Sequence, residues 1–142
     1  MSAPGTVRIG ILGFGTVGQG TWKHLCENAD SLERILGVRL EPIRASVRDL
    51  AKERPVAIPA EKLTTDSTSI VEDSSIDVIC ELIGGVDEAR ELTLKAFAHG
   101  KHVVTANKAL ICEHGEELFT AAEKAGVRYG FDASVAGGIP II

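Results

Sequence analysis

The sequence predicts an α/β fold, with a doubly wound, mostly parallel sheet that carries helices on both faces. Short apolar runs alternate with amphipathic stretches along the 142-residue chain, which is the pattern of strand–helix–strand units. The first of these runs leads directly into a glycine-rich turn. A chain of this length is expected to bury one core, so we treat residues 1–142 as one domain.

The first half of the chain shows this alternation from its start. Residues 7–12 are rich in branched apolar side chains and should form a strand, followed by a helix over 16–36 that stops at Gly37. Residues 39–47 predict a second strand, in which Pro42 indicates a bulge or an edge position, because proline donates no ladder hydrogen bond. A mostly irregular segment over 48–62, a short strand over 63–65 and a helix over 67–72 complete this half.

The second half is more sharply patterned. Residues 77–83 predict a strand, and Asp87 is expected to cap the helix that follows. Apolar side chains recur on one face of that helix, which Gly100 ends. Residues 102–105 predict a buried strand. A helix over 113–125, closed by Gly126, and a strand over 127–131 end the series.

The glycine-rich turn after the first strand is the most informative feature. It consists of Gly13, Phe14, Gly15, Thr16, Val17 and Gly18. Gly13 permits the tight turn, Gly15 leaves room for a diphosphate, and Gly18 lets the next helix pack closely on the sheet. The N-terminus of that helix offers free N–H groups to phosphates. The turn therefore predicts a Rossmann-type fold that binds a dinucleotide, with a purely structural glycine turn as the alternative.

The end of the second predicted strand indicates which dinucleotide is bound. Domains selective for NAD place an acid there, on the ribose 2′-hydroxyl. This chain has Arg48, whose guanidinium suits a 2′-phosphate, with Lys52 and Arg54 adding positive charge. We therefore expect NADP(H). Asp49 keeps NAD(H) open, and a solvated loop is the alternative to both.

Two later strand ends should face the same cleft, because doubly wound sheets bind ligands beyond the carboxyl ends of their strands. Gly84 follows the fourth strand and allows close backbone approach to a flat ring or a ribose, although a tight turn explains it equally well. Lys108 follows the fifth strand and can donate a proton to a developing alkoxide or orient a carbonyl. A surface lysine is the alternative.

Composition narrows the classes of partner. The net charge is −5 and the basic residues are scattered, so we expect no nucleic acid or membrane partner. No apolar run reaches the ~20 residues that span a bilayer, and the N-terminus lacks signal-peptide features. Cys26, Cys80 and Cys112 lack metal-site spacing and indicate reduced thiols in a cytoplasmic protein.

Four segments together resemble the cofactor domain of homoserine dehydrogenase. They are residues 13–18, 81–85, 103–110 and 133–142. The resemblance spans the whole chain in order. It implies the reversible reduction of L-aspartate 4-semialdehyde to L-homoserine with NADPH or NADH, on the route to threonine, methionine and isoleucine. It also implies a small-molecule substrate and a homo-oligomeric parent enzyme.

The resemblance implies roles for single residues as well. Phe14, Thr16 and Val17 would hold the diphosphate and the nicotinamide side, and Lys108 would serve cofactor binding and catalysis. A sodium-like monovalent cation would be held by one carboxylate and by backbone carbonyls. The matching positions are Asp132, Val135, Gly137 and Ile139. Asp132 replaces the glutamate usual in the family and is one methylene shorter.

The chain stops on the apolar residues 139–142, so we expect it to be the first domain of a longer protein. The resemblance implies that the substrate domain, with a further lysine and acidic residues, is absent and that this domain alone is inactive. Two alternatives stay open. One is a non-catalytic NAD(H)-sensing module, and the other is a related amino-acid-pathway reductase of the aspartate or dihydrodipicolinate type.

Overall fold

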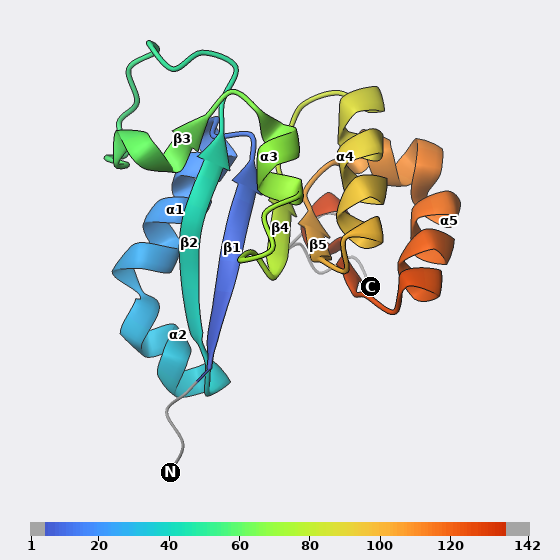
Figure 1. Cartoon of the computed structure of the whole chain (residues 1–142), viewed down its shortest axis with the longest axis horizontal. Coiled ribbons are helices and arrows are strands. Elements are labelled where there is room, and N and C mark those ends of the chain that lie inside the picture. The colour runs from blue at the N-terminus through green and yellow to red at the C-terminus, as the bar shows by residue number, and fades with distance from the viewer. Residues whose placement is uncertain (1–4, 136–142) are drawn as a thin grey trace.

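A six-stranded parallel sheet runs through the centre of the structure, a computed structural model that describes residues 5–135 (Figure 1). The strand order is β3-β2-β1-β4-β5-β6, and every strand pairs in parallel with its neighbours. The strands are β1 (Thr6–Leu12), β2 (Arg39–Ser46), β3 (Leu63–Thr64), β4 (Val78–Glu81), β5 (His102–Thr105) and β6 (Tyr129–Gly130). The order reverses beside β1, which confirms the predicted doubly wound Rossmann-type fold.

Helices cover both faces of this sheet. They are α1 (Thr16–Glu27), α2 (Ala29–Leu36), α3 (Ser67–Val71), α4 (Asp87–Ala98) and α5 (Lys108–Ala125), with 3₁₀ turns η1 (Ala60–Lys62) and η2 (Asp132–Ser134). Figure 1 shows α1 and α2 beside β1 and β2, and α3, α4 and α5 toward β4 and β5. Neighbouring side chains of β1 point to opposite faces of the sheet. Ile11 packs in the core under α1, and Leu12 packs in the core under α3, α4 and α5.

The helix predicted over 16–36 is two helices with a break at Asn28. The Asn28 backbone N–H donates to the His24 carbonyl oxygen at 3.0 Å, and Asn28 Nδ2 donates to the same oxygen at 3.0 Å. A side chain that competes for the helix backbone in this way favours an end over a continuation. Gly37 ends α2 in the left-handed conformation, as predicted, with a φ of 75°.

Pro42 lies at a bulge in β2, as predicted. Ile9 of β1 pairs with Pro42 and Gly10 pairs with Arg44, so Ile43 is the additional residue. On the other side of β2, β3 pairs only with Ala45 and Ser46. Among the described residues, Pro42 therefore faces no strand on that side, where its missing N–H would matter.

Helix α5 begins five residues before the predicted start at 113. Asn107 is its N-cap, and Asn107 Oδ1 accepts a hydrogen bond from the Leu110 N–H at 3.1 Å. Lys108 is consequently the first residue of a helix, and Cys112 lies within it. Helix α4 shows a smaller shift, because Asp87 is its first residue and not its cap.

Strand β5 is buried on one face only, where the sequence predicted a buried strand. Val103 is buried, whereas Val104 is 44% exposed. This alternation is typical of a strand with one solvent-facing side. In the described part of the chain, no helix combines the length and the hydrophobicity needed to cross a membrane.

Candidate functional site

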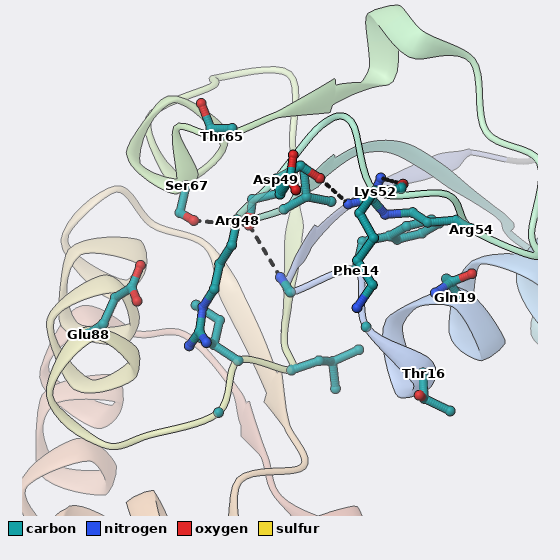
Figure 2. A pocket seen from close by; sticks show the side chains of 17 residues that line it. Phe14, Thr16, Gln19, Arg48, Asp49, Lys52, Arg54, Thr65, Ser67 and Glu88 are labelled. Carbon is teal, nitrogen blue, oxygen red and sulfur yellow. Dashed lines mark hydrogen bonds between the residues drawn. The ribbon is translucent and has the colours of Figure 1, made fainter.

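A cleft of about 460 Å³ lies at the carboxyl ends of β1, β2 and β4 (Figure 2). Its walls are the turn after β1, the loop after β2, the first turn of α3 and the turn after β4. This is the edge at which doubly wound sheets bind ligands. Of the predicted cofactor-binding residues, the lining includes Gly13, Phe14, Gly15, Thr16, Arg48 and Gly84.

The three glycines of the turn differ in what surrounds them. A Cβ atom on Gly13, whose φ is 91°, would lie 2.6 Å from the Leu82 carbonyl oxygen. A Cβ atom on Gly18 would lie 2.1 Å from the Gly13 carbonyl oxygen, whereas one on Gly15 would meet no atom within 4 Å. The fold therefore needs Gly13 and Gly18, while Gly15 leaves open space where a ligand can approach.

The N-terminus of α1 faces this open space without a cap. Gly15 is the N-cap residue, no side chain caps the first turn, and that turn contains no acidic residue. Thr16 and Val17 are exposed there. Uncapped N–H groups at the positive end of a helix suit an anion, so the residues present fit a diphosphate.

Ser46, at the end of β2, supports the turn from below. Its Oγ accepts hydrogen bonds from the Gly13 N–H at 3.2 Å and from Ser67 Oγ at 2.9 Å, and its carbonyl oxygen accepts from the Phe14 N–H at 2.9 Å. This serine was not predicted as part of the site. Its position between the buried residues Ala45 and Val47 is the signal, because a buried hydroxyl needs a partner.

Phe14 contributes its backbone to the cleft. Its side chain is buried and packs edge-on against Trp22, with 5.8 Å between the ring centroids. The expectation that this residue holds a cofactor therefore concerns its main-chain atoms. Gln19, one turn into α1, also lines the cleft, and its Oε1 accepts from the Val56 N–H at 3.3 Å.

The loop after β2 brings basic side chains to the cleft. Arg54 folds the loop on itself by donating to the carbonyl oxygens of Lys52 and Asp49. Asp49 Oδ1 accepts from the Ala51 N–H at 2.8 Å, so this carboxylate is engaged in its own turn. Figure 2 shows Lys52 extending over the glycine turn and Arg48 extending on the side of Glu88.

The guanidinium of Arg48, unlike that of Arg54, has no hydrogen-bond partner among the described residues. Within residues 5–135, it also makes no ion pair, and the residue is exposed at the cleft. A free guanidinium next to a cleft is available for a bidentate contact with a phosphate.

Other predicted site residues lie outside the cleft lining. Lys108 is exposed at the start of α5, Val17 is 58% exposed, and Gly18 is buried under the turn. Asp132 and Val135 are exposed at η2, while Gly137 and Ile139 lie outside the described residues. No cluster of three metal-ligating side chains occurs in the part of the chain that the structure describes. The proposed cation site therefore stays a prediction.

A buried carboxyl that was not among the predicted site residues lies at the end of β4, directly before the turn that carries Gly84. Glu81 is 0% exposed, and burial raises the pKa of its carboxyl, an effect partly offset by a hydrogen bond from Thr105. An acid inside the apolar run of residues 78–83 is the signal that could have found it, since charged side chains are almost never fully buried without partners.

Comparisons with known proteins agree on one family. Residues 13–132 match the family model described as "Homoserine dehydrogenase, NAD binding domain". The homoserine dehydrogenase of Synechocystis is 46% identical over 137 residues, which are 96% of this chain and 31% of that protein. The enzyme of Bacillus subtilis is 42% identical, with the same shares covered.

Solved structures point the same way. A crystal structure of a homoserine dehydrogenase from Thiobacillus denitrificans superposes with a TM-score of 0.89 at 48% identity, over 96% of this chain and 31% of that one. A hyperthermophilic archaeal homoserine dehydrogenase solved in complex with NADPH superposes with a TM-score of 0.74 at 25% identity, over 96% of this chain and 46% of that one.

Proposed function

The chain belongs to the homoserine dehydrogenase family, in which it corresponds to the NAD-binding domain, and on this premise we propose that it binds NADP(H) in preference to NAD(H). The observation that carries the preference is the free guanidinium of Arg48 at the end of β2. Asp49, the acid that could serve a ribose hydroxyl, is engaged with the Ala51 N–H. The archaeal relative solved with NADPH supports the same cofactor.

The cofactor would lie across the cleft in one direction. Its adenosine half would lie beyond β2, with the 2′-phosphate on Arg48, because the residue at the end of this strand contacts that ribose in Rossmann folds. The diphosphate would lie on the open side of Gly15, at the N-terminus of α1. The nicotinamide half would then lie beyond β4 and β5, near Gly84 and toward Lys108.

Lys108 is the proposed catalytic residue on this chain. It is exposed as the first residue of the helix that follows β5, at the edge of the sheet where the nicotinamide half is expected. The bound cofactor would supply or accept a hydride. The Lys108 ammonium would hold the nicotinamide half and orient or protonate the reacting oxygen of the substrate.

A monovalent, sodium-like cation belongs to the same proposal. It would be held by the carboxylate of Asp132 and by backbone carbonyls of Val135, Gly137 and Ile139, and hard oxygen ligands suit such an ion. Asp132 is exposed on η2, which leaves its carboxylate accessible to an ion.

The reaction is proposed for the whole protein. The chain spans 31% of the length of the curated relatives that it matches over most of its own length. We propose that the whole protein interconverts L-homoserine and L-aspartate 4-semialdehyde as a homo-oligomer in the cytoplasm, where the free thiols of its three cysteines would persist. The family match favours this over a non-catalytic sensor or a related reductase.

Direct titration of the chain tests the proposal. NADPH and NADH are added separately to the purified chain, and binding is followed by calorimetry and by the fluorescence of the reduced nicotinamide. We expect saturable binding of both nucleotides, with NADPH binding more tightly. Tighter binding of NADH would contradict the preference, and no saturable binding of either would contradict the cofactor role.

A further inference from the structure

The ends of two neighbouring strands, β4 and β5, meet at the buried carboxyl of Glu81. Glu81 Oε1 accepts a hydrogen bond from the Ile83 N–H at 2.8 Å, in the turn after β4. Glu81 Oε2 accepts from Thr105 Oγ1 at 2.5 Å, at the end of β5. One carboxyl thus holds its own turn through Oε1 and ties the end of β4 to the end of β5 through Oε2.

Asn107 extends this connection to the turn and to helix α5. The Asn107 N–H donates to Thr105 Oγ1 at 3.0 Å, and Asn107 Nδ2 donates to the carbonyl oxygens of Gly85 at 2.7 Å and Ile83 at 3.3 Å. Its Oδ1 meanwhile caps α5 through the Leu110 N–H. The side chain therefore holds the turn that carries Gly84 and the helix that starts with Lys108.

The 3₁₀ turn η2 joins the same arrangement. Ser134 is buried, and its Oγ donates to the Thr105 carbonyl oxygen at 2.9 Å. Thr105, which is 0% exposed, therefore bonds Glu81 at the end of β4, the N-cap of α5 and η2. Through these bonds it is linked to the three segments that bear Gly84, Lys108 and Asp132, to the first of them by way of Glu81.

We propose that Glu81, Thr105 and Asn107 are positioning residues that hold the nicotinamide half of the cofactor cleft in shape, an inference that rests on the proposed binding of NADP(H). The adenosine half of the cleft is supported separately, by Ser46 and Ser67 under the glycine turn. Loss of the Glu81 connection should consequently alter one half of the cleft and leave the other intact.

The physical basis is that the bonds of the Glu81 carboxyl to Thr105 and Ile83 are buried or partly buried, whereas the Asn107–Gly85 bond at the edge of the group is exposed. A buried acceptor that loses its donor bears the full cost of desolvation, so the segments cannot separate without leaving the Glu81 carboxyl unsatisfied. Positioning a turn and a helix start in this way is what a binding site needs from the residues behind it.

Comparing the affinities of two ligands distinguishes an effect on one half of the cleft from an effect on the other. NADPH uses the whole cleft, whereas adenosine 2′,5′-bisphosphate has only the adenosine half. For Thr105→Val, which keeps the shape and removes the hydroxyl, we expect NADPH to bind about tenfold more weakly, as one buried hydrogen bond allows. The bisphosphate should bind within about twofold of its affinity for the unsubstituted chain.

Thr105→Ser keeps the hydroxyl and should therefore bind NADPH as tightly as the unsubstituted chain does.

Asn107→Ser gives an independent test, because serine still caps a helix but is too short to reach Ile83 and Gly85. It should weaken NADPH binding and leave bisphosphate binding unchanged. Ala122→Gly is the control for general loss of stability, since Ala122 is buried in the second half of α5, away from the cleft; both ligands should bind it as they bind the unsubstituted chain.

The outcomes are distinct. The inference is overturned if Thr105→Val and Asn107→Ser both bind NADPH as tightly as the unsubstituted chain does. It is also overturned if these variants lose NADPH affinity and bisphosphate affinity by the same factor, or if Ala122→Gly loses as much NADPH affinity as they do. If the unsubstituted chain binds the bisphosphate and NADPH equally tightly, the nicotinamide half makes no contact and the inference is also overturned. If the unsubstituted chain binds neither ligand, the cofactor proposal itself is wrong and the inference falls with it.

Discussion

A Cβ atom at Gly18 would lie 2.1 Å from the carbonyl oxygen of Gly13. The atom in the way belongs to the backbone of the turn, so no side-chain rotation can make room for it. The close packing of α1 against the turn thus requires that residue 18 has no Cβ atom. This relationship belongs to the folded chain itself and requires no ligand.

Gly18→Ala should therefore destabilise the chain without any ligand present. Because the turn or the helix must shift, we expect the free energy of unfolding to fall by roughly 1–3 kcal/mol, the range typical of overpacking. Urea unfolding followed by circular dichroism measures it. The matched control is Gly20→Ala, since a Cβ there meets nothing within 4 Å. Equal stability of the two variants would contradict the account.

Arg48→Ala should discriminate between the two nicotinamide cofactors. Because hydrogen bonds to charged groups contribute about 1.5–3 kcal/mol, NADPH affinity should fall by about tenfold or more while NADH affinity stays unchanged. Arg34→Ala, an exposed arginine on α2, removes the same charge elsewhere and should change neither. Equal weakening of NADPH and NADH in Arg48→Ala would contradict a 2′-phosphate role.

The buried carboxyl of Glu81 should make stability depend on pH. Burial raises its pKa in the folded chain above the ordinary value of 4.5. Between these two pKa values the folded state holds a proton that the unfolded state has released, so the free energy of unfolding falls as pH rises through this window. The pKa of Tyr129 is raised, mainly by burial and also by the negative charge of Glu81, so this phenol stays neutral throughout.

Glu81→Gln cannot titrate and isolates this contribution. The difference in unfolding free energy between the variant and the unsubstituted chain should shift in favour of the variant as pH rises from about 4.5 toward 7. Other carboxyls titrate equally in both proteins and cancel in the difference. Parallel stability curves across this range would show that the Glu81 pKa is not raised.

The thiols of Cys80 and Cys112 should react with an alkylating reagent at different rates. Burial raises the pKa of the Cys80 thiol to about 11, whereas Cys112 is exposed on α5. Because the thiolate is the reactive form, iodoacetamide at pH 8.5 should label Cys112 and leave Cys80 largely unmodified in the folded chain. Peptide mass spectrometry measures this, with labelling in urea as the reference. Equal labelling rates of Cys80 and Cys112 in the folded chain would contradict the burial of β4.

Much of the fold could be predicted because its signals are local. The signals for β1, the glycine turn and Gly37 each lie within a few neighbouring residues, and each of these features was predicted correctly from them. The break at Asn28 and the cap at Asn107 were missed for a related reason. An asparagine ends or starts a helix where its side chain bonds the backbone, and neither the Asn28 bond to His24 nor the Asn107 bond to Leu110 can be read from neighbouring residue types.

The candidate site was predictable where one segment acts alone. Gly13, Gly15 and Arg48 line the cleft, and their place there follows from one turn and one strand end in the sequence. The pairs Ser46–Ser67 and Glu81–Thr105 join residues 21 and 24 positions apart. Such pairs become visible only when the strand order is known: β4 and β5 are neighbours that pair Glu81 with Thr105, and β2 neighbours β3, which α3 and its Ser67 follow.

Gly15 offers the most direct test that the turn binds a dinucleotide. A Cβ atom there meets nothing within 4 Å in the chain alone, so Gly15→Ala should fold, with a loss of stability of no more than about 1 kcal/mol because alanine is a poorer N-cap than glycine. It would nevertheless fill the space that the diphosphate must approach. Calorimetric titration with NADPH should show tight binding by the unsubstituted chain and by Gly20→Ala, and a loss of about tenfold or more in Gly15→Ala, as expected for displaced phosphate contacts. NADPH binding by a folded Gly15→Ala variant as tight as that of the unsubstituted chain would contradict the account.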